Sequence, residues 1–169
     1  FVFLAGTSAF LVGERKTKKE LSVFLMKRGL WLVFLELTII GLAWGFNPAF
    51  PFFRLQVIWV LGICMVILGV MVYLPPKLIL FFGLLILFGH NLLDTIHAEG
   101  NTLRDFFWAL LHERKRFFLE GRKINTGYPI IPWLGIMLLG YSAGQLYRKG
   151  MDALVRRKYL LIIGTVAIL

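Results

Sequence analysis

Long apolar segments separated by short polar breaks constrain this chain most. A helix needs about 20 apolar residues to cross the hydrocarbon core of a bilayer. Four segments approach that length and two shorter ones lie at the ends: Val23–Phe46, Leu55–Leu74, Leu78–Ile96 and Ile130–Tyr147, then Phe1–Val12 and Tyr159–Leu169. We expect an all-α, polytopic transmembrane helix bundle, with four complete and two truncated spanning helices. Residues 1–169 would form one integral membrane domain, an interior portion of a longer protein. We expect no β-sheet, because backbone that faces lipid must be hydrogen-bonded within each helix.

The amino-acid composition also indicates an integral membrane protein. The 169 residues are 59% hydrophobic and 17% charged, whereas soluble domains are about 45–50% apolar and about 25% charged. The net charge of +10 would suggest nucleic acid as the partner of a soluble protein. Here the basic residues cluster between apolar segments, which is the pattern of membrane topology. We therefore expect a lipid bilayer, and no nucleic acid, as the partner.

The charges of the connecting segments predict an orientation. Basic residues cluster in Gly13–Glu20, in Arg148–Lys158 and at the Pro75–Lys77 turn. Alternation of the spans puts these three segments on one side, and the positive-inside tendency makes that side cytoplasmic. The Asn47–Arg54 loop and the long Ala98–Tyr128 segment then face outward, although the latter is also rich in basic residues.

The long segment contains an amphipathic pattern. Leu103, Phe106, Phe107, Leu110 and Leu111 recur at helical spacing, with polar residues between them. This predicts a helix that lies in the membrane interface. Such a helix could be a lid or acceptor platform over a membrane site, or simply a connector that rests on the surface.

A polar run, Gly89–His97, ends the third complete apolar segment. If the helix continues, His90, Asp94 and His97 fall at i, i+4 and i+7 and share one face. A carboxylate that orients an imidazole is a common arrangement for general acid/base catalysis. The alternative is an interfacial cap, in which polar side chains meet water where the helix leaves the bilayer. We expect no bound metal, because this spacing occurs easily by chance.

Other polar residues lie inside the predicted spans. Glu36 is near the middle of Val23–Phe46, and Arg28 lies two turns earlier, so the two could form an ion pair in a cavity or in a helix-packing contact. Arg54 and Gln56 open the next segment, and Arg54 could anchor at headgroups or contact a substrate.

Small residues predict close helix packing in two segments. Gly135 and the run Gly140–Gly144 form one such surface, and Gly6–Ala9 could line a packing seam or a cavity.

Several segments carry a family resemblance in their order along the chain. They are Phe1–Leu11, Lys27–Leu32, Arg54–Gly62, Tyr128–Gly135 and Leu139–Tyr141. Together they resemble the heparan-alpha-glucosaminide N-acetyltransferase-like proteins, and bacterial members in particular. The resemblance implies an enzyme of the transmembrane acyltransferase superfamily in the bacterial inner membrane. Such proteins move an acyl group, such as acetyl, from acyl-CoA on the cytoplasmic side to an acceptor, often a sugar, on the other side. An oligomeric protein is compatible with this resemblance.

The resemblance also suggests roles. His90 and Asp94 become the catalytic candidates on the acceptor side, and Arg28, with Glu36 orienting it, would meet the CoA phosphates through charge-assisted bonds. The family's histidine in a His-Thr-Arg-Asp-like context belongs to a first helix that this chain does not contain, so His90 and Asp94 could instead support a base elsewhere.

Three further residues are candidate acceptor contacts: Asn91, Arg54 and Gln56. The alternative to an enzyme is a non-catalytic membrane subunit or a portion of a transporter within a larger assembly.

Overall fold

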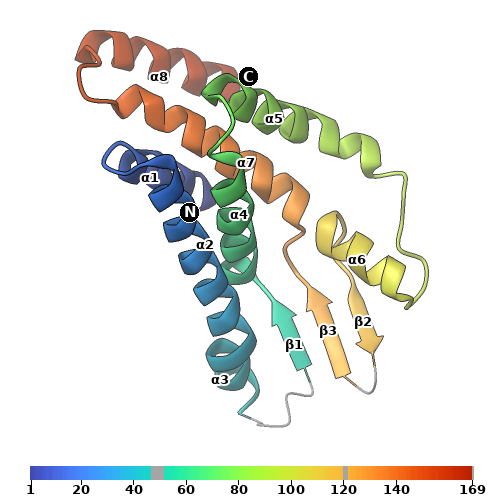
Figure 1. Ribbon diagram of the computed structural model, residues 1–169. Helices are drawn as coiled ribbons and strands as arrows, with labels where there is room; N and C mark the ends of the chain where they lie inside the picture. Colours follow the sequence, from blue (N-terminus) through green and yellow to red (C-terminus); the bar gives the residue numbers. More distant parts are fainter. Residues whose placement is uncertain (47–51, 120–121, 169) are drawn as a thin grey trace.

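The computed structural model describes residues 1–46, 52–119 and 122–168, and it is mostly helical (Figure 1). Its α-helices are α1 (Val2–Gly13), α2 (Lys18–Leu35), α3 (Gly41–Gly45), α4 (Val57–Met71), α5 (Pro76–Gly89), α6 (Leu103–Leu111), α7 (Ile130–Ala143) and α8 (Ala153–Ile168). A π-helical turn, η1 (Glu36–Ile40), joins α2 to α3. Two 3₁₀ turns, η2 (His90–Leu93) and η3 (Gly144–Tyr147), extend α5 and α7. The break predicted at Asn47–Pro51 lies outside the described residues.

The helices pack around one main apolar core. α2 packs along α4, and α7 packs against both α1 and α5. Leu25, Val60, Leu68, Met137 and Leu138 are fully buried in this core. Because lipid is as apolar as these side chains, the pairing of helices within a membrane comes from van der Waals packing of their closely fitting faces.

Glycines set the spacing of the helix pairs. A Cβ at Gly140 would overlap the carbonyl of Phe3 in α1, and a Cβ at Gly135 would lie 2.8 Å from the side chain of Ile86 in α5. The predicted packing role of this small-residue surface is confirmed. Gly6 likewise lies against the backbone of α7 at Met137, so it belongs to a packing seam.

Fewer helices than predicted have the length of a membrane span. Within the described residues, two are long and apolar enough, Pro76–Leu93 and Ile130–Tyr147. Val2–Gly13 and Val57–Met71 are apolar but shorter. The polytopic bundle with four complete spans therefore remains an expectation.

A three-stranded sheet contradicts the prediction that no β-sheet would form. Its strands are β1 (Phe52–Leu55), β2 (Arg116–Leu119) and β3 (Arg122–Thr126), in the order β1-β3-β2. β3 is parallel to β1 and antiparallel to β2. The prediction was wrong because its argument applies only to backbone within the hydrocarbon region. Apart from Leu55, the strand residues lie between the predicted apolar segments, where the backbone need not face lipid.

The sheet and α6 share a small core of their own. Ala98, Ala109 and Phe117 are buried there, packed against Phe106, Trp108 and Ile124. The predicted amphipathic helix is confirmed as α6, and Thr102 and Asp105 form a capping box at its start. Figure 1 shows α6 beside the strands at one end of the helices.

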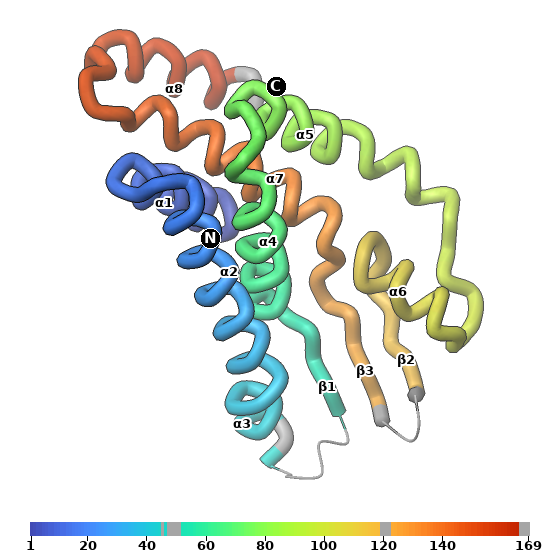
Figure 2. The backbone as a smooth tube through the Cα atoms, viewed as in Figure 1, coloured from blue at the N-terminus to red at the C-terminus, as the bar shows by residue number. Residues whose placement is uncertain are grey.

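The connecting segments gather at two ends. Arg148 Nε lies 3.2 Å from Glu14 Oε1, and Lys18 Nζ donates to the carbonyl of Tyr73 at 3.2 Å. Residues of all three basic segments (Lys16, Pro76 and Arg148) line one cavity, so the segments meet at one end of the bundle, which we call the basic end. Figure 2 shows the sheet at the opposite end of α4 and α7. The assignment of the basic end to the cytoplasmic side remains an expectation.

Candidate active site

The polar run after α5 does not continue as an α-helix. α5 ends at Gly89, η2 adds one 3₁₀ turn, and Asp94 follows that turn as its C-cap. The expected single face of His90, Asp94 and His97 is therefore wrong, because it required helical geometry through residue 97.

His90 is oriented by the end of α5 and not by Asp94. Its Nδ1 lies 2.9 Å from the carbonyl oxygen of Leu87 and 3.1 Å from that of Ile86. Both partners only accept hydrogen bonds, so Nδ1 carries the proton in the neutral ring and Nε2 carries the lone pair. The imidazole is half-buried. His90 thus has one fixed nitrogen and one nitrogen that can take up a proton.

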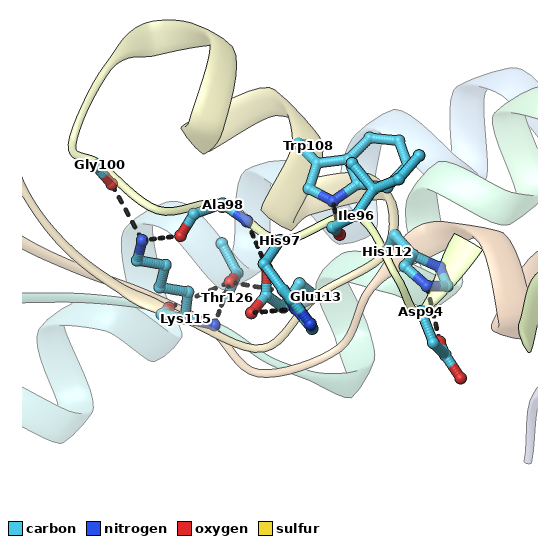
Figure 3. Close-up of polar contacts among 10 residues, drawn as sticks. All are labelled: Asp94, Ile96, His97, Ala98, Gly100, Trp108, His112, Glu113, Lys115 and Thr126. Carbon is cyan, nitrogen blue, oxygen red and sulfur yellow. Dashed lines mark hydrogen bonds and ion pairs between the residues drawn. The ribbon is translucent and has the colours of Figure 1, made fainter.

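Asp94 pairs with a different histidine. Its Oδ1 lies 2.9 Å from His112 Nε2, and the side chains are 62% and 5% exposed, respectively (Figure 3). Nε2–H donates to the carboxylate, so in the neutral ring the lone pair is on Nδ1. That Nδ1 is buried and has no hydrogen-bond partner among the described residues.

His112 links the end of α6 to the end of α5. It is the C-cap residue of α6, and its ring centroid lies 5.5 Å from that of Trp108 and 6.4 Å from that of His90. Sequence reasoning missed His112 as a functional candidate. The only available signal was an imidazole directly after the amphipathic helix.

A second pair holds the segment between η2 and α6. His97 Nδ1 lies 3.7 Å from Glu113 Oε1, and Glu113 Oε2 accepts the Ala98 N–H at 2.8 Å. Trp108 Nε1 donates to the Ile96 carbonyl at 2.8 Å (Figure 3). The backbone of residues 96–98 is therefore fixed against α6 and the residues that follow it.

Lys115 and Thr126 complete this network. Lys115 Nζ donates to the carbonyls of Ala98 and Gly100. The Thr126 hydroxyl, which is buried, accepts the Lys115 N–H at 3.0 Å. β3 is thereby tied to the residues before β2.

An open groove of about 930 Å³ lies between residues 96–102 and α6. Its polar lining includes His97, Glu99 and Arg104, and its apolar lining includes Phe107 and Trp108. His90 and His112 do not line it.

Arg28 and Glu36 are not brought together. They are eight residues apart, roughly 12 Å along a helix, and no ion pair joins them among the described residues. Arg28 is exposed, stacks 6.0 Å over Phe24 and lines a cavity of about 400 Å³ that Glu36 does not line. Glu36 is buried, and its Oε1 accepts the Gln56 N–H at 3.3 Å. It therefore caps the N-terminus of α4 from a neighbouring helix.

The three acceptor candidates are also dispersed. Arg54 stacks on Trp44 and Phe52, at 5.2 and 4.8 Å, respectively. Gln56 is the N-cap residue of α4 and binds Glu36 through its backbone. Asn91 is exposed in η2, next to His90. Of the three, only Asn91 lies in the His90 region by its position in the chain.

Within the part of the chain that the structure describes, no group of three or more His, Cys, Asp or Glu side chains could hold a metal ion. Acid/base chemistry at His90, and at the Asp94–His112 pair, is what the arrangement itself offers.

Comparison with known proteins gives one family. The family model described as "Heparan-alpha-glucosaminide N-acetyltransferase, catalytic" matches residues 1–168, which is essentially the whole chain. No curated protein and no solved structure matches the chain.

Proposed function

The chain belongs to the heparan-alpha-glucosaminide N-acetyltransferase catalytic family, and from this membership we propose that it transfers an acyl group, such as acetyl, from acyl-CoA to an acceptor such as a sugar. The family match over residues 1–168 is the observation that carries the proposal. Two helices that could span a membrane fit a membrane acetyltransferase. The membrane would be the bacterial inner membrane, with Gly13–Glu20 and Arg148–Lys158 on the cytoplasmic side.

His90 is the proposed base. The acceptor amine or hydroxyl attacks the thioester carbonyl, the bond from acyl carbon to acceptor forms, and the C–S bond breaks. Nε2 of His90 takes the proton from the acceptor and returns it to the departing CoA thiolate. The carbonyls of Leu87 and Ile86 hold Nδ1–H and so keep Nε2 free for this task. A positioned general base typically contributes about 10²–10⁴-fold in rate.

Asp94 has a positioning role in this proposal. Its bond to His112 fixes the end of α6 beside the end of α5, and the His112 ring lies next to that of His90. Asn91, exposed beside His90, offers an amide to the acceptor. Arg54 and Gln56 are already engaged in packing and capping contacts, so we assign them no acceptor contact.

The test is acyl-CoA turnover by the purified protein in nanodiscs. Release of the CoA thiol from acetyl-CoA is followed with and without amino-sugar acceptors. We expect acceptor-dependent release, a fall in kcat of about 10²-fold or more in His90→Gln, and little change in Thr95→Ala, an exposed neighbour. Turnover by His90→Gln equal to that of the unmodified protein would reject His90 as the base. A folded protein that releases no thiol with any acceptor would favour the non-catalytic alternative.

A further inference from the structure

A cavity of about 240 Å³ opens at the basic end, between the α1–α2 connection, the start of α5 and the end of α7. Lys16, Lys18 and Arg148 line it together with one carboxylate, Glu14. Three cations against one anion leave the lining with a net charge of +2. This cavity is separate from the one that Arg28 lines.

The floor of the cavity differs from its rim. Leu21, Val72 and Ile79 are buried apolar residues of the lining, and the Phe10 and Tyr141 rings, which also line the cavity, meet edge-on at 5.4 Å. The cationic side chains at the rim are exposed. A cationic rim over an apolar floor suits a ligand that joins an anionic group to a less polar one.

The basic side chains are only partly engaged. Lys16 Nζ lies 5.9 Å from the centroid of the Phe24 ring, a contact that uses none of its N–H groups as hydrogen-bond donors. Arg148 contacts Glu14 through Nε, and its side chain is 69% exposed, so both Nη groups remain as donors. Lys18 Nζ donates to the Tyr73 carbonyl and has further N–H groups to offer. Guanidinium and ammonium donors form short, charge-assisted bonds with phosphate oxygens.

We propose that this cavity binds a phosphate group through Lys16, Lys18 and Arg148, and that Glu14 competes with the phosphate for Arg148. Two ligands share this chemistry, the phosphates of an acyl-CoA donor and the headgroup of an anionic lipid. The donor assignment rests on the proposed acyltransferase function. The phosphate site itself does not depend on that function.

The position of the cavity suits a donor whose reactive end is remote from its phosphates. Pro76, the first residue of α5, lines the cavity, and His90 follows the last residue of α5. Fourteen helical residues rise roughly 21 Å. A donor bound by its phosphates at the basic end would reach His90 only through the long flexible arm that carries the thioester.

The test is direct binding to the purified protein in nanodiscs, measured without turnover. The probes are CoA, pyrophosphate, and pantetheine, which has the arm but no phosphate, each in phosphatidylcholine nanodiscs. A fourth experiment tests the lipid headgroup itself: phosphatidylglycerol replaces phosphatidylcholine in the nanodiscs, and no other probe is added. Lys16→Gln and Lys18→Gln should each weaken CoA and pyrophosphate binding by about 5- to 10-fold. Pantetheine binding should be unchanged by either variant.

Glu14→Gln should act in the opposite direction. It removes a negative charge from the lining and frees Arg148, so CoA and pyrophosphate should bind several-fold more tightly. Two variants with the same change in net charge are the controls: Lys19→Gln, which is adjacent to Lys18 but does not line the cavity, and Glu99→Gln at the other end of the molecule. Neither control should change binding by more than about twofold.

The outcomes distinguish a failure of the proposed phosphate site from a failure of the proposed acyltransferase function. Loss of CoA and pyrophosphate affinity in the lysine variants, with tighter binding in Glu14→Gln, supports the donor site. Pyrophosphate or phosphatidylglycerol binding with the same dependence, but no CoA binding, supports the phosphate site and overturns the donor assignment. Phosphate binding that is indifferent to Lys16, Lys18 and Glu14 overturns the site, while acetyl-CoA turnover in the same preparations would leave the proposed function standing.

Discussion

The approach of α2 to α4 predicts a measurable cost for adding one methyl group. A Cβ at Gly29 would lie 2.5 Å from the carbonyl oxygen of Gly62, and a Cβ at Gly62 would lie 2.6 Å from that of Gly29. Ordinary contact begins near 3.4 Å, so the two backbones must separate by about 0.9 Å (3.4 minus 2.5). Overpacking of this kind costs about 1–3 kcal/mol, and the better helix propensity of alanine returns roughly 1 kcal/mol. We expect Gly29→Ala and Gly62→Ala each to lower the free energy of unfolding by about 0–2 kcal/mol, and so to be about 1–3 kcal/mol less stable than a Gly→Ala variant at an open helical site.

The measurement is thermal or denaturant unfolding of the purified protein in detergent, followed by tryptophan fluorescence. Gly164→Ala in α8 is the matched control, because nothing lies within 4 Å of a Cβ at that position. It should be neutral or slightly stabilising. The double variant should lose less unfolding free energy than the two single variants lose together, since one separation of the helices accommodates both methyl groups. Single variants as stable as Gly164→Ala would refute the reasoning, and strictly additive losses would refute the shared contact.

Three other predictions concern the sheet and α6. Phe117→Ala removes the largest fully buried side chain of the small core and should cost about 3–5 kcal/mol of local stability, seen as faster hydrogen exchange in residues 103–126. Thr126→Val removes the hydroxyl that accepts the Lys115 N–H and should cost about 1–3 kcal/mol in the same measurement. Hydrogen bonds from Thr102 lower the pKa of Asp105. The cap therefore stabilises α6 fully above the unfolded-state pKa of Asp105. This stability is lost as the pH falls through the lowered pKa, and Asp105→Asn should abolish the pH dependence of helix fraying.

The helices could largely be predicted from local patterns, and their limits followed from cap chemistry more than from apolar length. α5 begins at Pro76, and α7 follows Pro129 at its N-cap, as the prolines suggest. α2 begins at Lys18 and not near Val23, because Thr17 and Glu20 form a capping box. That signature was present in the sequence. The apolar length that predicts a span begins only at Val23, because it leaves out the charged residues before that position.

The sheet could not be predicted in the same way. Each strand has only four or five residues, and β1 pairs in register with a strand that lies about 70 residues later: Phe52 opposes Lys123. No periodicity within β1 indicates such a distant partner, because strand formation depends on what packs beside it. Helix packing brings the two connecting segments to the same end, where their backbones pair.

At the candidate site too, the sequence indicates which residues carry the chemistry but not which partners they contact. Sequence spacing identified His90 and Asp94 correctly as polar residues at the end of an apolar helix, but it paired them with each other. Asp94 instead meets His112, 18 residues later, because α6 folds back beside η2. The two histidines consequently depend on different parts of the fold. The free nitrogen of His90 is determined within α5, by the carbonyls of Ile86 and Leu87. The orientation of His112 depends on α6 and its small core. A substitution that detaches α6 should therefore break the Asp94–His112 pair while it leaves the His90 tautomer intact, so the contributions of the two imidazoles to activity can be measured separately.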